Sequence, residues 1–186
     1  TVPKGFLFSA AEAAIKKPGC RDMALIVSIK EAVASGMFTK NRIKAAPVRL
    51  DMKKIRSGKA QAIIINSGNA NACTGAQGMR DADEMSELTA KGMNLKKGLV
   101  YVCSTGVIGA CMPMDRVREG ISGLTNNIGK SSILDVAAAI MTTDSFRKTA
   151  SRKINIGNKT ITITGVCKGA GMICPDMATM LCFILT

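Results

Sequence analysis

Residues 168–181 read Lys168-Gly169-Ala170-Gly171-Met172-Ile173-Cys174-Pro175-Asp176-Met177-Ala178-Thr179-Met180-Leu181. They place Thr179 directly after a small alanine, behind a glycine-spaced loop and ahead of an apolar run. A threonine hydroxyl is a weak nucleophile unless a base lies beside it. One such base is the threonine's own α-amine, with an ordinary pKa of about 7.7–8.0, which exists only after the preceding peptide bond is cut. The stretch therefore has two interpretations: a self-processing nucleophile at Ala178–Thr179, or a glycine turn into a buried strand over 180–185.

Apolar, β-branched runs bounded by glycine or polar turns predict strands elsewhere in the chain. These runs are 23–28, 46–50, 60–66, 98–103, 159–165 and 180–185. Apolar residues spaced three to four apart predict helices over 76–91, 114–124 and 134–141. Residues 154–164 alternate apolar and polar side chains around Gly157-Asn158, which predicts a hairpin with one buried face. The alternation of strands with helices predicts an α/β architecture.

The composition restricts the class of partner. The formal charge is +13 over 186 residues, but the basic residues are dispersed and aromatic residues make up only 3%. A nucleic-acid surface usually adds aromatic stacking or a recognisable reading helix, so we expect no nucleic-acid partner. The charge is then solvated surface, or it faces an acidic partner chain or anionic substrates. No apolar run approaches the ~20 residues of a membrane span, and the first residues do not resemble a signal peptide, which predicts a cytoplasmic protein without membrane contact.

The seven cysteines are not spaced as Cys-x-x-Cys, and the chain contains no histidine. Zinc sites that need imidazole are therefore excluded, and a thiolate-only site lacks its usual paired spacing. The sequence predicts buried, reduced thiols and neither a metal nor a cofactor.

Loops at the ends of predicted strands carry the candidate site residues. Residues 66–75 hold three asparagines, which predict either a self-satisfied loop capping the next helix or a set of amides for a ligand. Thr105 beside Gly106 offers a hydroxyl and an amide to an oxyanion, or else forms a plain turn. Lys168 could anchor a carboxylate or lie on the surface, and Thr142 could bind substrate or simply end a helix. Ligands of α/β proteins gather where strands end, so these signals are stronger together.

Taken together, residues 44–48, 66–75, 104–109, 141–144 and 168–181 resemble the ornithine acetyltransferase family, the bifunctional enzymes of the cyclic arginine pathway. The resemblance spans almost the whole chain in the expected order. It implies an α/β sandwich fold shared with the DmpA-type aminopeptidases. It also implies a precursor that cuts itself at Ala178–Thr179, so that residues 1–178 form an α chain and residues 179–186 begin a β chain. The expected assembly of these chains is an α₂β₂ heterotetramer.

The resemblance also implies roles for individual residues. Thr179 matches the acyl-accepting nucleophile, and Thr105 and Gly106 match the oxyanion-hole pair. Thr142, Lys168 and Thr179 match substrate-binding positions. Thr143 remains the alternative to Thr142, because the two threonines are adjacent.

The implied reaction moves the acetyl group of N²-acetylornithine to glutamate through an acetyl-threonine, with acetyl-CoA as a further donor in some members. Other substrate-binding groups belong to the β region that follows residue 186, so we expect the isolated chain to be inactive. Two alternatives stay open. One is a DmpA-like aminopeptidase, in which water replaces glutamate as the acceptor. The other is a non-catalytic basic binding module, which predicts salt-sensitive binding to nucleic acid and no self-cleavage.

Overall fold

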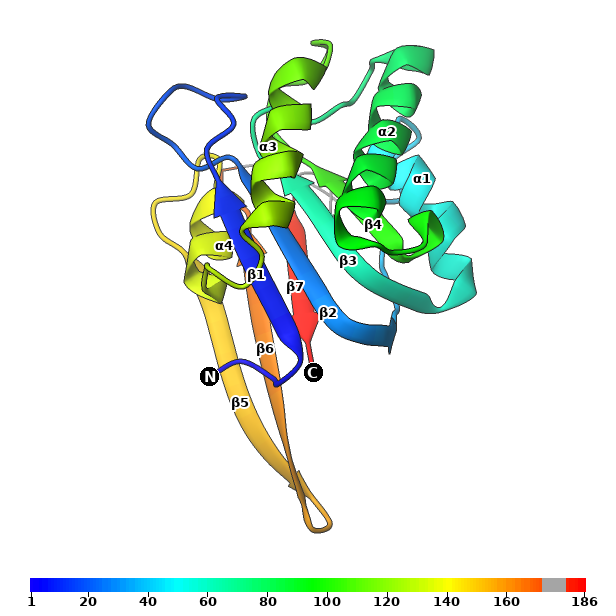
Figure 1. Ribbon diagram of the computed structural model, residues 1–186. Coiled ribbons are helices and arrows are strands. Elements are labelled where there is room, and N and C mark those ends of the chain that lie inside the picture. The colour runs from blue at the N-terminus through cyan, green and yellow to red at the C-terminus, as the bar shows by residue number, and fades with distance from the viewer. Residues whose placement is uncertain (172–179) are drawn as a thin grey trace.

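Two β-sheets and the helices packed on them form the chain in the computed structural model, which describes residues 1–171 and 180–186 (Figure 1). The first sheet has the strand order β1-β2-β3-β4 and the second has the order β5-β6-β7. The strands are β1 (Phe6–Ala11), β2 (Met23–Val33), β3 (Lys59–Asn66), β4 (Val100–Ser104), β5 (Lys148–Ile156), β6 (Lys159–Lys168) and β7 (Leu181–Leu185). The α-helices are α1 (Ala46–Lys54), α2 (Gly75–Met93), α3 (Met114–Asn126) and α4 (Ile133–Ala139).

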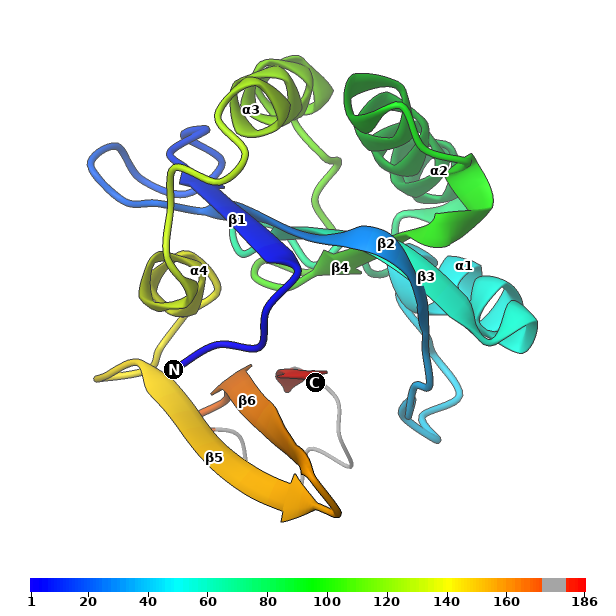
Figure 2. The same ribbon diagram turned by 60° about the horizontal axis from the view of Figure 1, so that its bottom comes forward.

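The first sheet lies between two layers (Figure 2). Helices α2 and α3 cover one face, while α4 and the second sheet cover the other. The alternation of side chains along β2 explains this arrangement, because successive residues of a strand point to opposite faces. Met23, Leu25 and Val27 pack in the cluster with α2 and α3. Ala24 and Ile26 pack in the cluster with α4 and the second sheet.

The central strands also set the position of the functional loops. β3 and β4 are parallel neighbours, and α2 connects them. Their carboxyl ends therefore lie side by side, which brings the loops after Asn66 and after Ser104 to the same edge of the sheet. The other strand pairs of both sheets are antiparallel. The structure thus confirms the α/β class and the strand–helix alternation predicted from the sequence.

One predicted strand was wrong. Residues 46–50 were expected to be extended, but they open helix α1. Pro47 lies in the first turn of α1, where a missing N–H is tolerated and the fixed φ suits a helix. A run of five mostly apolar residues is too short for its periodicity to separate a strand from a helix. Strand β1 had no counterpart in the prediction.

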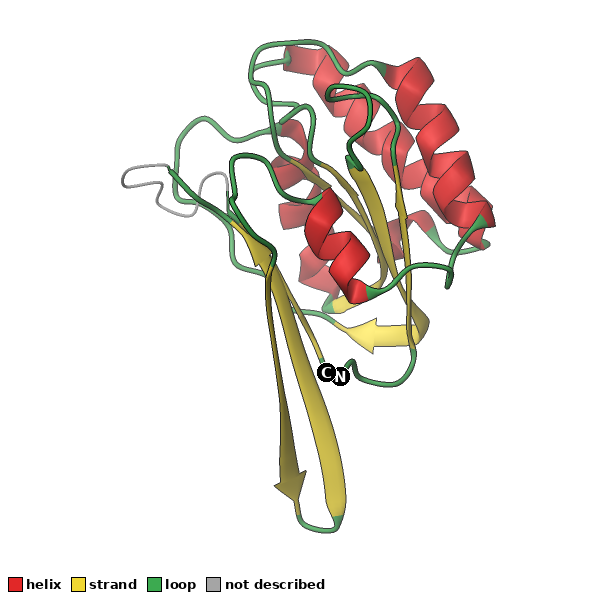
Figure 3. Cartoon of the chain, turned by 90° about the vertical axis from the view of Figure 1, so that its left-hand side faces the viewer, coloured by secondary structure: helices red, strands yellow, loops and turns green. Residues whose placement is uncertain are grey.

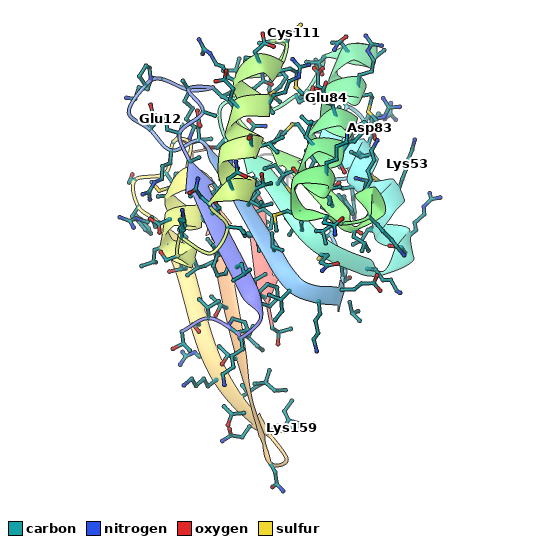
Figure 4. All side chains as sticks on the ribbon, viewed as in Figure 1. Glu12, Lys53, Asp83, Glu84, Cys111 and Lys159 are labelled. Carbon is teal, nitrogen blue, oxygen red and sulfur yellow. The ribbon has the colours of Figure 1, made fainter. Side chains whose placement is uncertain are left out.

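The predicted hairpin is present, but the face that was predicted to be buried is exposed near the turn. β5 and β6 pair across the turn at Gly157-Asn158, yet Ile154 and Ile156 are 41% and 59% exposed. The hairpin extends past the body of the molecule, so no layer covers its outer half (Figure 3). Lys159 lies near the tip of this extension (Figure 4).

The cysteines also differ from the prediction of buried thiols. The six that the structure describes are free, but Cys73, Cys111 and Cys182 are exposed, and Cys20, Cys103 and Cys167 are only partly buried. Cys73 and Cys111 are exposed because they lie in loops, and Cys182 is exposed because it lies on a face of β7 that the described residues leave uncovered. Within the described residues, no helix has both the length and the apolar character needed to cross a membrane.

Helix α1 protects the outer edge of β4, which ends the first sheet. The Val102 N–H donates to both carboxylate oxygens of Asp51, at 3.1 and 3.2 Å. Two residues earlier on the same strand, the Val100 carbonyl accepts from Lys54 Nζ at 2.6 Å. The Asp51 and Lys54 side chains thus bond to backbone groups of the β4 edge that could otherwise pair with a strand of another molecule. Burial raises the pKa of the Asp51 carboxyl to about 7, opposed by the Val102 N–H and by Lys54.

This raised pKa predicts a pH-dependent stability. The folded state binds a proton at Asp51 more tightly than the unfolded state does, so the free energy of unfolding should fall as pH rises from about 4 to about 7, by up to about 4 kcal/mol. Asp51→Asn keeps an acceptor for Val102 and should remove this dependence. Urea unfolding of the complete protein at pH 5 and pH 8 measures it. Asp115→Asn, at a fully exposed carboxylate, is the control. Equal pH dependence in wild type and Asp51→Asn would contradict the assignment.

Candidate active site

Three asparagines, at the end of β3 and in the loop after it, satisfy one another's hydrogen bonds. The Asn66 side-chain oxygen accepts from the amides of Gly68 and Asn69, at 3.2 and 3.0 Å. Asn69 in turn accepts from the Asn71 amide at 2.7 Å, and Asn71 donates to the Gly78 carbonyl of α2 at 2.8 Å. All three asparagines are buried. Of the two interpretations left open by the sequence, the structure supports the one in which this loop holds itself and the next helix.

Gly106 lies against this loop and has no room for a side chain. Its φ is +129°, in a region that residues with a Cβ rarely adopt. A Cβ built at this position would lie 2.4 Å from the carbonyl carbon of Gly68. The neighbouring Val107 N–H donates to the Gly68 carbonyl at 3.2 Å. This bond joins the loop after β4 to the loop after β3. Within the described part of the chain, the Gly106 amide donates no hydrogen bond, and Gly106 is exposed.

Lys168 joins the three segments that carry the candidate site residues. It is the last residue of β6 and is 3% exposed. Its Nζ donates to Thr105 Oγ1 at 2.6 Å and to Thr142 Oγ1 at 3.3 Å. Thr105 follows β4, and Thr142 follows α4. The structure therefore brings together Thr105, Gly106, Thr142 and Lys168, which lie up to 63 positions apart in the sequence. The interpretation of Lys168 as a surface lysine is wrong.

The geometry distinguishes the adjacent threonines. Thr142 faces Lys168, whereas the Thr143 hydroxyl donates to the Ala170 carbonyl at 3.3 Å. Thr142 is exposed as a residue, although its hydroxyl accepts from the buried Lys168. Of the two positions, Thr142 is the one that belongs to the Lys168 cluster.

Burial sets the electrostatics of this cluster. It lowers the pKa of Lys168, and the nearby cation Lys16 lowers it further, while the carboxylate of Asp144 raises it. Asp144 itself lies against the backbone of the site, because its oxygens accept from the amides of Gly169 and Thr142 at 2.9 and 3.3 Å.

Lys16 was not identified from the sequence. It lies in the loop between β1 and β2, and its Nζ donates to the Met141 carbonyl beside Thr142. The fully buried carboxylate of Asp22 organises this loop by accepting from the amides of Ala13, Ile15 and Lys16 at 2.7–2.9 Å. An aspartate directly before a buried strand was the available signal for a structured loop. Nothing in the local sequence indicated that Lys16 reaches Met141.

Ala178 and Thr179 lie outside the described residues, so their predicted roles stay predictions. The described residues continue from Met180, and Leu181 of β7 is the cross-strand partner of Lys168. Within the described residues, no three Cys, Asp or Glu side chains are grouped closely enough to hold a metal ion.

Comparison with known proteins identifies the family. The sequence matches the ArgJ family over residues 7–186. The chain belongs to the ArgJ family. The arginine biosynthesis bifunctional protein ArgJ of Geobacter sulfurreducens is 52% identical over 98% of this chain and 47% of the relative. Its namesake from Caldanaerobacter subterraneus is 51% identical over 100% of this chain and 46% of the relative. The chain thus spans about half the length of the curated ArgJ relatives.

Solved ArgJ structures have the same fold. The arginine biosynthesis bifunctional protein from Bacillus halodurans superposes with a TM-score of 0.88 at 36% identity, covering 96% of this chain and 92% of the solved one. Ornithine acetyltransferase from Mycobacterium tuberculosis, solved in complex with ornithine, gives a TM-score of 0.85 at 34% identity, covering 93% and 92%. These similarities confirm the family resemblance and the α/β sandwich inferred from the sequence.

Two glycines of this ArgJ-family loop provide a matched test of the contact at Gly106. Gly106→Ala should lower stability by clearly more than Gly109→Ala, because only Gly106 is packed against backbone. Gly109 also has a positive φ, of +82°, but open space around it, so its substitution should cost about 1 kcal/mol from strain alone. Thermal unfolding of the two variants of the complete protein measures the difference. Equal losses would show that the Gly68 contact is unimportant.

Proposed function

We propose that this chain is the amino-terminal half of an enzyme of arginine biosynthesis that moves an acetyl group from N²-acetylornithine to glutamate through Thr179. The observation that carries the proposal is the buried Lys168 ammonium, which donates to two threonine hydroxyls beside the Gly106 amide, and no described residue accepts from that amide. The names of the relatives support the pathway, and the ornithine complex of the Mycobacterium tuberculosis protein supports the substrate class.

The lengths of the relatives support cleavage of a precursor. This chain covers 92% of each of the two solved chains but under half of the curated sequences. The solved chains are therefore about half as long as the curated relatives, as expected of a precursor cut near its middle. In the proposal, residues 1–178 form the α chain, and the β chain starts at Thr179 and supplies the rest of the substrate pocket. The expected assembly is an α₂β₂ heterotetramer in the cytoplasm.

The first reaction in this proposal is self-cleavage. Thr179 Oγ attacks the carbonyl carbon of Ala178, and the C–N bond breaks as the proton moves to the nitrogen. The product is an ester between Ala178 and the Thr179 oxygen, with a free α-amine on Thr179. Water then hydrolyses the ester, releasing the Ala178 carboxylate and restoring the hydroxyl. The freed amine lies beside the hydroxyl and can accept its proton near neutral pH.

The second reaction is acetyl transfer in two steps. The Thr179 amine takes the hydroxyl proton as Oγ attacks the acetyl carbon, and ornithine leaves with that proton on its α-nitrogen. The acetyl-threonine is then attacked by the α-amine of glutamate, which yields N-acetylglutamate and the free threonine. The reaction needs no cofactor, and acetyl-CoA is a possible alternative donor that forms the same acetyl-threonine.

Thr105, Gly106 and Lys168 have complementary roles in this scheme. Lys168 donates to a lone pair of Thr105 Oγ1, so the Thr105 hydroxyl proton is free to point away from the lysine. Together with the Gly106 amide, it can donate to the oxyanion of the tetrahedral intermediate, an arrangement that typically lowers the barrier by a few kcal/mol. Within the described residues, Lys168 uses two of its three N–H groups, and the third can bind a substrate oxygen. Leu181, two positions after Thr179 in the sequence, is the cross-strand partner of Lys168, which supports a shared role for Thr179 and this cluster.

The processing step predicts a specific mass pattern. The complete protein should give two fragments that separate before Thr179, whereas Thr179→Ala should remain one polypeptide, as intact-mass spectrometry can show. The processed protein should release ornithine from N²-acetylornithine and form N-acetylglutamate only when glutamate is present. Ornithine release that does not respond to glutamate would instead favour a DmpA-like hydrolase. An uncut wild-type protein with full activity would contradict the mechanism.

The Lys168 cluster predicts a difference between neighbouring threonines. Thr142→Val removes the hydroxyl that accepts from Lys168 while keeping a similar shape, so kcat/KM for acetylornithine should fall about 10-fold to 100-fold. Thr143→Val removes only a neutral bond to Ala170 and should change kcat/KM less than about 3-fold. Steady-state kinetics of the two variants provide the measurement. A larger loss in Thr143→Val would place the substrate contact at Thr143 instead.

A further inference from the structure

Asp144 is a buried carboxylate that lies behind the proposed site. Its side chain is fully buried, and it forms an ion pair with Lys148 of β5. One oxygen accepts from the Gly169 amide at 2.9 Å, and the other accepts from the Thr142 amide at 3.3 Å. Gly169 directly follows Lys168, so one carboxylate contacts the backbone of two segments that carry site residues.

We propose that Asp144 is a positioning residue, which fixes Thr142 and Lys168 relative to each other and supplies a buried negative charge to the Lys168 cluster. This inference rests on the proposed function, because it assigns the protonated Lys168 a task in that reaction. Asp144 does not itself touch the reacting atoms in this arrangement.

The first part of the inference follows from the backbone contacts. Lys168 ends a strand, and beyond that point the sheet no longer holds the chain. The bond from Gly169 to Asp144 extends the fixed region by one residue past the strand end. The bond from Thr142 anchors the loop after α4 to the same carboxylate. A shift of Asp144 would therefore change the Thr142–Lys168 contact from both sides.

The second part follows from the charges around Lys168. Lys16 from the β1–β2 loop acts on it as a like charge, and Lys148 pairs with Asp144. Among the described residues, the hydroxyls of Thr105 and Thr142 contact the Lys168 ammonium without adding charge. Asp144 is the carboxylate that raises the pKa of Lys168 against the effects of burial and of Lys16. Burial works to raise the pKa of Asp144, but its bonds from Lys148, Gly169 and Thr142 outweigh this and lower it, so the carboxylate is charged near neutral pH.

The chemical consequence concerns the third N–H of Lys168. A protonated lysine donates to both threonines and still offers a charge-assisted bond to a carbonyl or carboxylate oxygen of the substrate. A neutral lysine has only two N–H groups, and the two threonines already use both. Loss of the proton should therefore remove substrate binding at this position, so the alkaline limb of kcat/KM should follow the pKa of Lys168.

The test is Asp144→Asn in the complete protein, with Asp83→Asn as the matched control. Asp83 also pairs with a lysine, Lys97, at 2.7 Å, but it lies on the outer side of α2 (Figure 4). In Asp144→Asn, kcat/KM should fall at least about 10-fold and its alkaline limb should move toward acid by about one pH unit or more. The control should keep both at their wild-type values. An unchanged alkaline limb in Asp144→Asn would overturn the inference that Asp144 acts as the counter-charge of Lys168.

A titration that is independent of activity separates this inference from the proposed reaction. With ¹³Cε-labelled lysine, the resonance absent from Lys168→Arg reports the pKa of Lys168 by NMR. That pKa should be lower in Asp144→Asn than in wild type. An unchanged Lys168 titration overturns the inference even if acetyl transfer is observed. A lowered pKa in a protein without acetyl transfer supports the electrostatic link and rejects only the proposed reaction.

A second variant covers the case in which Asp144→Asn does not fold. Asp144→Glu keeps the charge but moves the oxygens, so kcat/KM should fall while the alkaline limb stays near its wild-type position. A limb that moves to acid in Asp144→Glu, although the charge is retained, would overturn the counter-charge. An unchanged kcat/KM in this variant would overturn the positioning role.

Discussion

The burial of the Lys168 ammonium is the constraint on which the arrangement of the candidate site depends. An isolated cation taken out of water is costly unless oxygen atoms surround it, so the fold must bring acceptors to it from elsewhere. The acceptors come from the end of β4 and from the loop after α4, on two different elements of the sandwich. The contact therefore ties the first sheet, α4 and the second sheet together at one point, and a change in any of these layers would disturb the site.

The loops after β3 and β4 form a rigid backbone that holds Thr105, one of the two acceptors of Lys168. The parallel ends of β3 and β4 place two loops side by side, and the buried asparagines leave the first of them almost no freedom. The second loop packs against it so closely that only glycine fits at position 106. Thr105 is held between this glycine and the strand, with its own amide bonded to the Asn66 carbonyl at 3.0 Å. A hydroxyl fixed in this way can be aimed without the entropy cost of ordering a mobile side chain.

The sequence was informative where structure is local and periodic. Helices α2 and α3 repeat their apolar residues over many positions, so their type and approximate ends could be predicted. Helix α1 could not, because a short apolar run containing Pro47 fits either a strand or a first helical turn. Thr105, Gly106, Thr142 and Lys168 were selected from strand-end patterns and from the family resemblance. Lys16 was missed as a site residue because its contact is long-range, as shown by the 125 positions that separate it from Met141. Asp144 was missed because its link to the Lys168 segment, the bond from the Gly169 amide, spans 25 positions. The segment with Ala178 and Thr179 lies outside the described residues, so its part of the prediction is neither confirmed nor contradicted.

The second sheet has a consequence for handling the protein. Within the described residues β7 has one neighbouring strand, and Ile184 on it is 69% exposed, close in the sheet to a hairpin that also shows isoleucines to solvent. An unshielded edge with apolar side chains readily accepts a strand from another molecule. Copies of this chain that are produced alone would therefore compete to pair with each other at this edge. Aggregation of the isolated chain at high concentration is the expected practical consequence.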